Sequence, residues 1–447
     1  MFYSFPSDFI WGVATSAYQI EGAVTEDGRG LSVWDTFCHR PGTIKNGHTG
    51  DVACDHYHLF RQDIDLMAQL KIPAYRFSIS WSRIFPEGIG PINQKGLDFY
   101  SRLLDEILTK GITPFVCLHH FDLPQALQDQ GGWPNRRTAY FFSEYARTIA
   151  QKLGDRLNYW FTHNEPWVVA ILGYGLGEHA PGQKNWFLAF KAFHHLLLSH
   201  GLAYEAIKAV LGSRAQIGLT LNLSPVHPAS ALEQDQLAAK RMDTFLNRLQ
   251  LDPLLKAQTP ILENWLGKLC SPFFIKKDDL QQIAKLDLLG INYYSRNVVR
   301  YDRKVPLLKA ASIRPSDRPF SLMWEIYPEG IYEIVLRIFN EYRPNCKLFI
   351  TENGAPFPDH PHKNEEINDD SRISFIQEHL KALHRALEQG VPVKGYFHWS
   401  LLDNFEWALG YSMRFGLVYT DYPTQKRLVK KSGFWFKKLI QDNGFAI

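Results

Sequence analysis

The chain has 447 residues, of which 45% are hydrophobic and 21% are charged. A chain of this length and composition can bury a large core, so it is neither an intrinsically disordered nor a fibrous protein. Its 49 basic and 46 acidic side chains leave a formal charge of +3. This balance gives no electrostatic footprint for nucleic acid or for an anionic membrane. No stretch approaches the roughly 20 consecutive apolar residues that a membrane helix needs.

Eight short runs rich in apolar, β-branched and aromatic residues predict strands. In chain order they are Phe9–Ala17, Ala74–Ser80, Thr113–His120, Tyr159–Pro166, Gln216–Leu223, Asp287–Tyr294, Lys347–Gly354 and Val393–Asp403. Most of them read as nearly continuous apolar segments, which is typical of strands buried on both faces.

Helical patterns lie between these runs. The clearest are Gln94 to Lys110, which Gly111 follows as a stop signal, and Asp370 to Glu388. Eight strands, each followed by a helix, predict an α/β fold with a single (β/α)₈ TIM barrel and extended βα loops. No interior linker is rich enough in Gly, Ser or Pro to divide the chain, so we expect one domain over 1–447. Two charged, proline-containing segments, Arg300–Pro319 and Pro356–Asn368, are expected to be exposed loops.

The N-terminal sequence MFYSFPSDFIWG lacks the basic segment, apolar run and cleavage site of a secretory signal peptide. The cysteines at positions 38, 54, 117, 270 and 346 include no CxxC pair, so neither a disulfide framework nor a zinc knuckle is supported. We therefore expect a cytoplasmic protein. Whether it forms a homo-oligomer stays open.

Two glutamates end predicted strands on opposite sides of the barrel. Glu165 ends the fourth strand and Glu352 the seventh, and both would therefore face the active-site mouth. A carboxylate is costly to bury without a task or a partner. Two opposed carboxyl groups are what the cleavage of a glycosidic bond needs. The alternative interpretation is that each is a structural acid paired with Arg76 or another basic residue.

Aromatic residues surround the last strand end. Trp399 and Trp407 flank it, beside Glu406, and such a mixture suits a sugar, whose CH face stacks while its hydroxyls form hydrogen bonds. The alternative is that these tryptophans only fill the core.

Histidines offer a competing metal hypothesis. His56 and His58 form an H-x-H, and two adjacent pairs occur at 119–120 and 194–195, but no HExxH is present. No phosphate-binding glycine loop occurs either. We therefore expect no metal and no cofactor.

Two motifs, Asn164-Glu165-Pro166 and Thr351-Glu352-Asn353-Gly354, resemble the signature pair of glycoside hydrolase family one, the β-glucosidases. The resemblance covers nearly the whole chain. Further stretches that share it are 9–22, 75–83, 324–330 and 415–419.

The resemblance implies that Glu165 is the general acid/base and Glu352 the nucleophile. The family retains the anomeric configuration through a glycosyl-enzyme intermediate, so we predict carboxyl groups about 5 Å apart. Tyr294 matches a phenol that contacts the nucleophile, and Arg76 matches a cation beside it. Both would favour the ionised form of Glu352.

The resemblance also implies two sets of substrate-binding residues. The sugar-binding set is Gln19, His120, Asn164, Asn292, Trp399, Glu406 and Trp407. The residues that match the aglycone channel are Trp167, Leu172 and Trp324. The partner is then a small-molecule β-glycoside.

One motif departs from the commonest family pattern. His120-Phe121-Asp122 replaces His-Trp-Asp, a variant that also occurs in the 6-phospho-β-galactosidase branch. Glu406 would repel a phosphate dianion, which favours an unphosphorylated sugar. We predict an exo-acting β-glucosidase that also accepts β-galactosides or β-fucosides. A 6-phospho-β-glycosidase, a transglycosidase and a non-catalytic carbohydrate-binding barrel are the alternatives.

Overall fold

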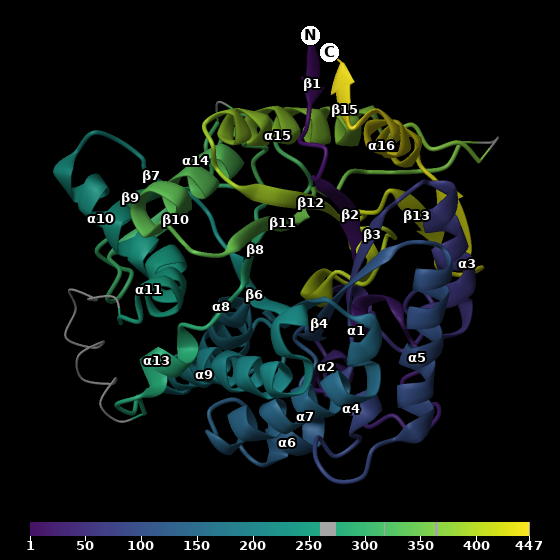
Figure 1. The fold of residues 1–447 in the computed structure, drawn as a ribbon. Helices are drawn as coiled ribbons and strands as arrows, with labels where there is room; N and C mark the ends of the chain where they lie inside the picture. The colour runs from purple at the N-terminus through teal and green to yellow at the C-terminus, as the bar shows by residue number, and fades with distance from the viewer. Residues whose placement is uncertain (260–273, 317, 363–364, 447) are drawn as a thin grey trace.

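The structure is a computed structural model that describes residues 1–259, 274–316, 318–362 and 365–446. Eight parallel strands close a barrel in the order β11-β12-β2-β3-β4-β5-β6-β8 (Figure 1). Their bounds are β2 (Ile10–Ala14), β3 (Ala74–Ser78), β4 (Thr113–His119), β5 (Tyr159–Asn164), β6 (Gln216–Asn222), β8 (Leu288–Asn292), β11 (Lys347–Asn353) and β12 (Val393–Trp399). All eight predicted strands and the barrel are confirmed.

The strands end earlier than predicted, where polar residues turn the chain away from the barrel. The last strand ends at Trp399 instead of Asp403, and the fourth ends at Asn164. Glu165 adopts a left-handed backbone conformation with φ of 47° and forms the N-cap of the next helix. Pro166 then occupies the first helical turn, where its missing N–H costs nothing. The predicted catalytic residue therefore lies on a sharp strand-to-helix turn.

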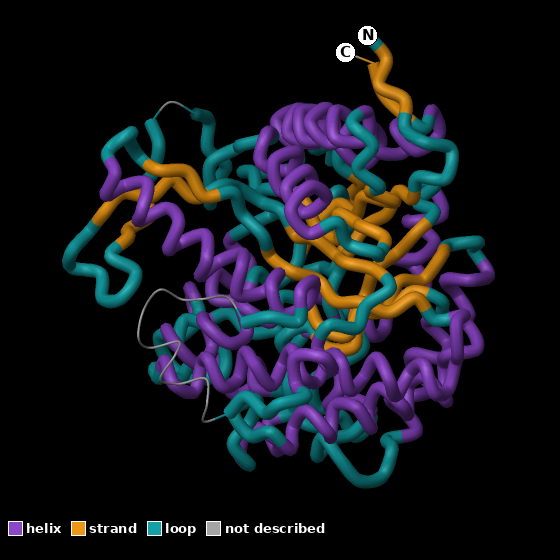
Figure 2. Tube along the Cα trace, turned by 60° about the vertical axis from the view of Figure 1, so that its left-hand side comes forward, coloured by secondary structure: helices purple, strands orange, loops and turns teal. Residues whose placement is uncertain are grey.

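Helices surround the barrel on all sides (Figures 1 and 2). The described helices are α1 (Ala17–Ile20), α2 (Val33–Cys38), α3 (His56–Gln69), α4 (Trp81–Ile84), α5 (Gln94–Thr109), α6 (Gln125–Asp129), α7 (Arg137–Leu153), α8 (Pro166–Ala170), α9 (Trp186–Leu211), α10 (Glu233–Asp243), α11 (Leu249–Lys256), α13 (Asp279–Ile283), α14 (Glu329–Arg337), α15 (Asp370–Glu388) and α16 (Lys431–Asp442). Both predicted helices are confirmed, as α5 and α15. Gly111, just beyond α5, has φ of +71°, as its stop signal implied.

The prediction that Arg300–Pro319 is an exposed loop is wrong in part. β9 (Asn297–Tyr301) and β10 (Ala310–Ile313) form an antiparallel pair that overlaps this segment. With β7 (Val226–Pro228) they form a three-stranded sheet outside the barrel. The strands are short, and the charged residues between them masked the pairing pattern. Residue 317 lies outside the described residues.

The second predicted loop, Pro356–Asn368, contains neither helix nor strand in its described part, which omits 363–364. Two further strand pairs lie outside the barrel: β1 (Phe2–Ser4) with β15 (Gly444–Ala446), and β13 (Val418–Asp421) with β14 (Lys426–Val429). The first pair brings the two chain termini together (Figure 1). The assignment of 1–447 to one domain stays a prediction.

The barrel interior is closed by large side chains. Phe115, Phe161, Phe349 and Phe397 are buried there in one cluster, which also includes Trp399. Barrel strands filled in this way form a solid core below the open, carboxyl-terminal face. Trp399 therefore forms part of a fixed floor beneath that face.

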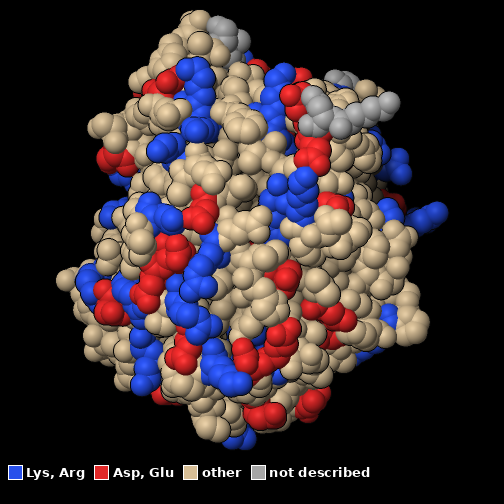
Figure 3. All heavy atoms as spheres, turned by 90° about the vertical axis from the view of Figure 1, so that its right-hand side faces the viewer, with Lys and Arg blue, Asp and Glu red and all other residues tan. Residues whose placement is uncertain are grey.

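Charges of both signs alternate over the α3 and α5 side of the molecule (Figure 3). Lys110, the C-cap residue of α5, for example, pairs with Asp65 of α3 at 2.6 Å. Across the described residues, no helix is both long and apolar enough to span a membrane.

Candidate active site

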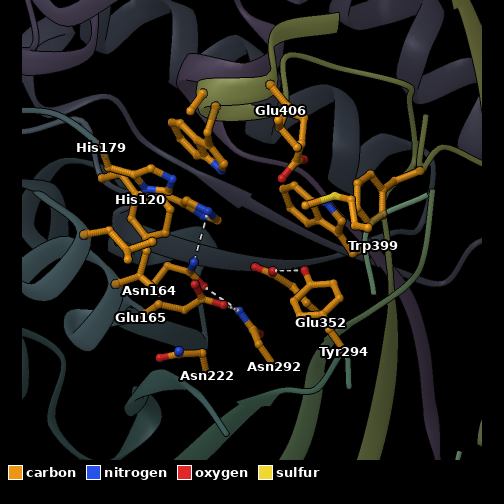
Figure 4. A pocket seen from close by; sticks show the side chains of 18 of the residues that line it. His120, Asn164, Glu165, His179, Asn222, Asn292, Tyr294, Glu352, Trp399 and Glu406 are labelled. Atoms are coloured by element: carbon orange, nitrogen blue, oxygen red, sulfur yellow. Dashed lines mark hydrogen bonds between the residues drawn. The ribbon is translucent and has the colours of Figure 1, made fainter. Parts of the chain in front are cut away.

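A cavity of about 300 Å³ lies at the carboxyl ends of the barrel strands. Most of the predicted site residues line it (Figure 4). They are His120, Asn164, Glu165, Leu172, Asn292, Tyr294, Trp324, Glu352, Trp399, Glu406 and Trp407. The strand ends that the sequence singled out therefore converge on one space.

Glu352 lies near the end of β11 and is 3% exposed. The guanidinium of Arg76 donates to its Oε1 at 2.6 Å, and the Tyr294 hydroxyl donates to its Oε2 at 2.6 Å. Burial raises the pKa of Glu352, while Arg76 and Tyr294 both lower it. These two contacts stabilise the carboxylate, as the resemblance implied.

Glu165 has a different environment. Asn292 Nδ2 donates to its Oε1 at 2.7 Å, but no cation contacts it in the described chain. Burial, together with the nearby charge of Glu352, raises the pKa of Glu165 to about 8. Glu165 therefore keeps its proton at neutral pH, when it can act as an acid.

Two asparagines connect the glutamates through hydrogen bonds. Asn164 Oδ1 accepts from Arg76 at 2.7 Å and from Asn292 Nδ2 at 3.1 Å. The side-chain oxygen of Asn292, Oδ1, in turn accepts from the Thr351 hydroxyl at 2.8 Å. This chain of contacts fixes the two carboxyl groups relative to one another. A carboxyl separation of about 5 Å, as retaining enzymes require, stays a prediction.

The opposite wall consists of aromatic rings and a third carboxyl group. The ring centroids of Trp399 and Trp407 each lie 5.9 Å from that of His120. Burial lowers the pKa of His120 well below its usual value, so the ring is neutral. Glu406 points into the cavity (Figure 4), and its buried Oε2 has no hydrogen-bond partner in the described chain. Burial and the charge of Glu352 raise the pKa of Glu406 to about 8.

A buried polar atom without a partner is costly, so the Glu406 carboxyl oxygen has a free hydrogen-bonding position that faces the cavity. Binding of a sugar hydroxyl by Glu406 stays a prediction. Together, the aromatic walls and convergent polar groups have the composition of a sugar pocket.

Three predicted site residues lie behind the cavity wall. Arg76 is fully buried beneath Glu352. Gln19 donates to Asn404 Oδ1 at 3.0 Å and to the Phe405 carbonyl at 2.8 Å, next to Glu406. Trp167 donates to the carbonyl of Phe245 at 2.9 Å. Direct contacts of Gln19 with a sugar and of Trp167 with an aglycone stay predictions.

Comparison with known proteins decides the family. The sequence profile described as "Glycosyl hydrolase family 1" matches residues 1–445. The chain belongs to this family. The resemblance inferred from the motifs is confirmed.

Named relatives match over nearly their full length. The chain is 48% identical over 443 residues to "Beta-glucosidase A" of Thermotoga maritima, covering 98% of each chain. It is 44% identical over 461 residues to "Bifunctional beta-D-glucosidase/beta-D-fucosidase" of Bifidobacterium breve, again covering 98% of each. A solved structure, "Beta-glucosidase from Thermotoga maritima in complex with galacto- hydroximolactam", matches with a TM-score of 0.94 and 46% identity, over 99% of this chain and 100% of that one.

Several residues of this family 1 site were not predicted from the sequence. They are Phe121, Val168, His179, Asn222, Leu223, Ser224, Met323, Ala408, Leu409 and Phe415. Asn222 ends β6, so the rule that singled out the other strand ends would have found it. His179 and Phe415 lie in loops, where no periodic pattern indicates which way a side chain points.

The histidines singled out for a metal have other partners. His56 contacts Asp63 at 2.8 Å, and His194 contacts Asp279 at 2.7 Å. Within the described ranges, no three His, Cys, Asp or Glu side chains are grouped as metal ligands would be.

Proposed function

We propose that this family 1 chain is a retaining exo-β-glucosidase. It removes terminal, non-reducing β-D-glucosyl residues from short oligosaccharides and from aryl and alkyl glycosides. The observation that supports this most directly is the contrast between the two glutamates. Glu352 is held by Arg76 and Tyr294, whereas no cation of the described chain contacts Glu165, whose pKa is raised to about 8. Environments that separate two carboxyl groups in this way assign a nucleophile and an acid.

In the first step, Glu352 attacks the anomeric carbon while the bond from that carbon to the aglycone oxygen breaks. Glu165 donates its proton to this oxygen, so the aglycone leaves as a neutral alcohol. The sugar remains as an ester on Glu352.

In the second step, the ester has removed the negative charge that helps to raise the Glu165 pKa. Glu165 is therefore a carboxylate and can take a proton from water. The water oxygen attacks the anomeric carbon and the ester bond breaks, which frees the Glu352 carboxylate. Two inversions at the same carbon give net retention.

The remaining residues bind and orient the sugar. Trp399 lies beneath the sugar ring, and His120, Asn164, Asn292, Glu406 and Trp407 bind its hydroxyls, with Gln19 beside them. Leu172 and Trp324 line the aglycone side of the cavity. Trp167 supports that side from behind.

We infer that β-fucosides and β-galactosides are also accepted. The B. breve relative is named a β-glucosidase and β-fucosidase, and the T. maritima structure contains a galacto-configured ligand. A 6-phospho-β-glycosidase is disfavoured, because the described lining of the cavity contains no lysine or arginine to pair with a phosphate dianion, which would also meet the buried Glu406 carboxyl.

Time-resolved proton NMR with an aryl β-D-glucoside tests the proposal. β-Glucose that forms before the α-anomer would support a retaining glucosidase. α-Glucose formed first would contradict Glu352 as the nucleophile. Turnover of a 6-phosphoglucoside, but not of the glucoside, would favour the phosphorylated substrate.

A further inference from the structure

Six charged side chains form a largely buried cluster behind the cavity: Asp359, Asp369, Arg372, Asp403, Arg414 and Lys430. Lys430 Nζ donates to Asp359 Oδ2 at 2.6 Å and to Asp403 Oδ1 at 2.7 Å. Arg414 donates to the other oxygen of Asp403 at 2.9 Å, and Arg372 donates to Asp359. Lys430, Asp403 and Arg372 are each 0% exposed. Among the described residues, Lys430 thus bridges Asp359 and Asp403.

The cluster joins two segments that both contribute to the cavity wall. Asp403 lies between Trp399 and Glu406, and Arg414 lies directly before Phe415. The backbone N–H of Gly416 donates to Asp403 Oδ1 at 2.9 Å. A Cβ at Gly416 would lie only 2.2 Å from the Asp403 nitrogen, so no side chain fits between the segments. Asp403 therefore fixes the 413–416 segment against the one that ends in Glu406.

Lys430 approaches Asp403 from outside both segments. It is the N-cap of α16, and its backbone N–H donates to the carbonyl of Leu417 at 2.9 Å. Asp359 comes from the connection between β11 and α15. Lys430 thereby links the outer helices to Asp403, which lies three positions before Glu406.

We propose that Lys430 is a positioning residue that, through Asp403, holds the segment placing Glu406 and Trp407 against the sugar. It thereby contributes to discrimination among sugar hydroxyls. This inference rests on the proposed function. A buried ion cluster gives little net stability compared with apolar packing, because desolvation offsets the Coulomb attraction. Its contribution is instead the fixed geometry that several short, directional hydrogen bonds impose on the loop.

The test replaces Lys430 with the uncharged, similarly long methionine. In the Lys430→Met variant, Asp359 and Asp403 face each other without their shared cation, so the loop shifts. The control is Lys431→Met, the neighbouring residue, which is an exposed lysine paired with Asp370 at 2.7 Å. Both variants are compared with the unmodified protein on 4-nitrophenyl β-D-glucoside and β-D-fucoside. Compared with glucose, fucose lacks the 6-hydroxyl and carries an axial 4-hydroxyl, so it can make fewer of the hydroxyl contacts proposed for Glu406 and Trp407.

We expect kcat/KM for the glucoside to fall about tenfold in Lys430→Met, which corresponds to the loss of about one hydrogen bond, and that for the fucoside to fall about twofold. Lys431→Met should change neither. An equal loss on both substrates, or no loss, would overturn the inference, because a merely structural lysine does not change the ratio.

A second variant covers the case in which Lys430→Met does not fold. Asp359→Asn removes the charge of one Lys430 partner while keeping its shape, and it should move the fucoside-to-glucoside ratio in the same direction. An unmoved ratio overturns the inference. If the unmodified protein hydrolyses no β-glucoside, the proposed function fails, and the inference fails with it. An active protein with unchanged ratios refutes this inference alone.

Discussion

The Tyr294 hydroxyl should set the acid limit of activity. In Tyr294→Phe, Glu352 Oε2 loses a donor that lies 2.6 Å away in a buried site. A hydrogen bond to a charged group contributes about 1.5–3 kcal/mol. At about 1.36 kcal/mol per pKa unit, its loss raises the pKa of Glu352 by about one to two units. The acid limb of the pH profile, which needs the Glu352 carboxylate, therefore moves to higher pH by about that amount.

The alkaline limb should stay near its original position, because it reports loss of the Glu165 proton, with a pKa of about 8. The assay is kcat/KM for an aryl β-glucoside against pH, which reports the free enzyme. Tyr342→Phe is the matched control, since it removes a phenol that donates to Asp252 at 2.7 Å, away from the cavity. An acid limb that coincides in Tyr294→Phe and the unmodified protein would refute this reasoning.

Three further predictions follow from the structure. Glu165→Ala should lower kcat/KM for alkyl glucosides by about 10²–10⁴-fold. The loss should be far smaller for nitrophenyl glucosides, because their leaving group needs no proton. Equal losses for the two substrate classes would be inconsistent with an acid role. Burial lowers the pKa values of His119 and His398 to about 3, so the unfolded chain binds protons below pH 6.5 that the folded protein does not. These two histidines therefore contribute a free energy of unfolding that is present above pH 6.5 and is lost as the pH falls toward 3. Urea titrations in which a His398→Gln variant keeps the pH profile of the unmodified protein would argue against this. Gly416→Ala should lower the melting temperature and the activity together, because its Cβ would lie 2.2 Å from the Asp403 nitrogen. A calorimetric melting temperature equal to that of the unmodified protein would contradict this clash.

The sequence predicts best the residues whose positions are determined by the barrel strands. Glu165 and Glu352 could be placed opposite each other because all parallel strands of a barrel end at one face. The pairing of β9 with β10 could not be predicted, since short strands outside the core lack a strong hydrophobic pattern. His179 and Phe415 were missed for a similar reason: their loops reach the cavity through tertiary contacts, which local sequence does not encode.

The different tasks of the two glutamates come from their surroundings and not from their residue type. Arg76 contacts Glu352 at 2.6 Å and Asn164 at 2.7 Å, so one buried guanidinium both stabilises the Glu352 carboxylate and orients the amide beside Glu165. Replacing Arg76 with methionine would remove the cation while burial remained, and the two carboxyl pKa values would converge. The protein would then lose the single ionised partner that retention requires. A motif that names two glutamates is therefore incomplete as a description of this site, because an arginine on β3 determines which of them gives up its proton first.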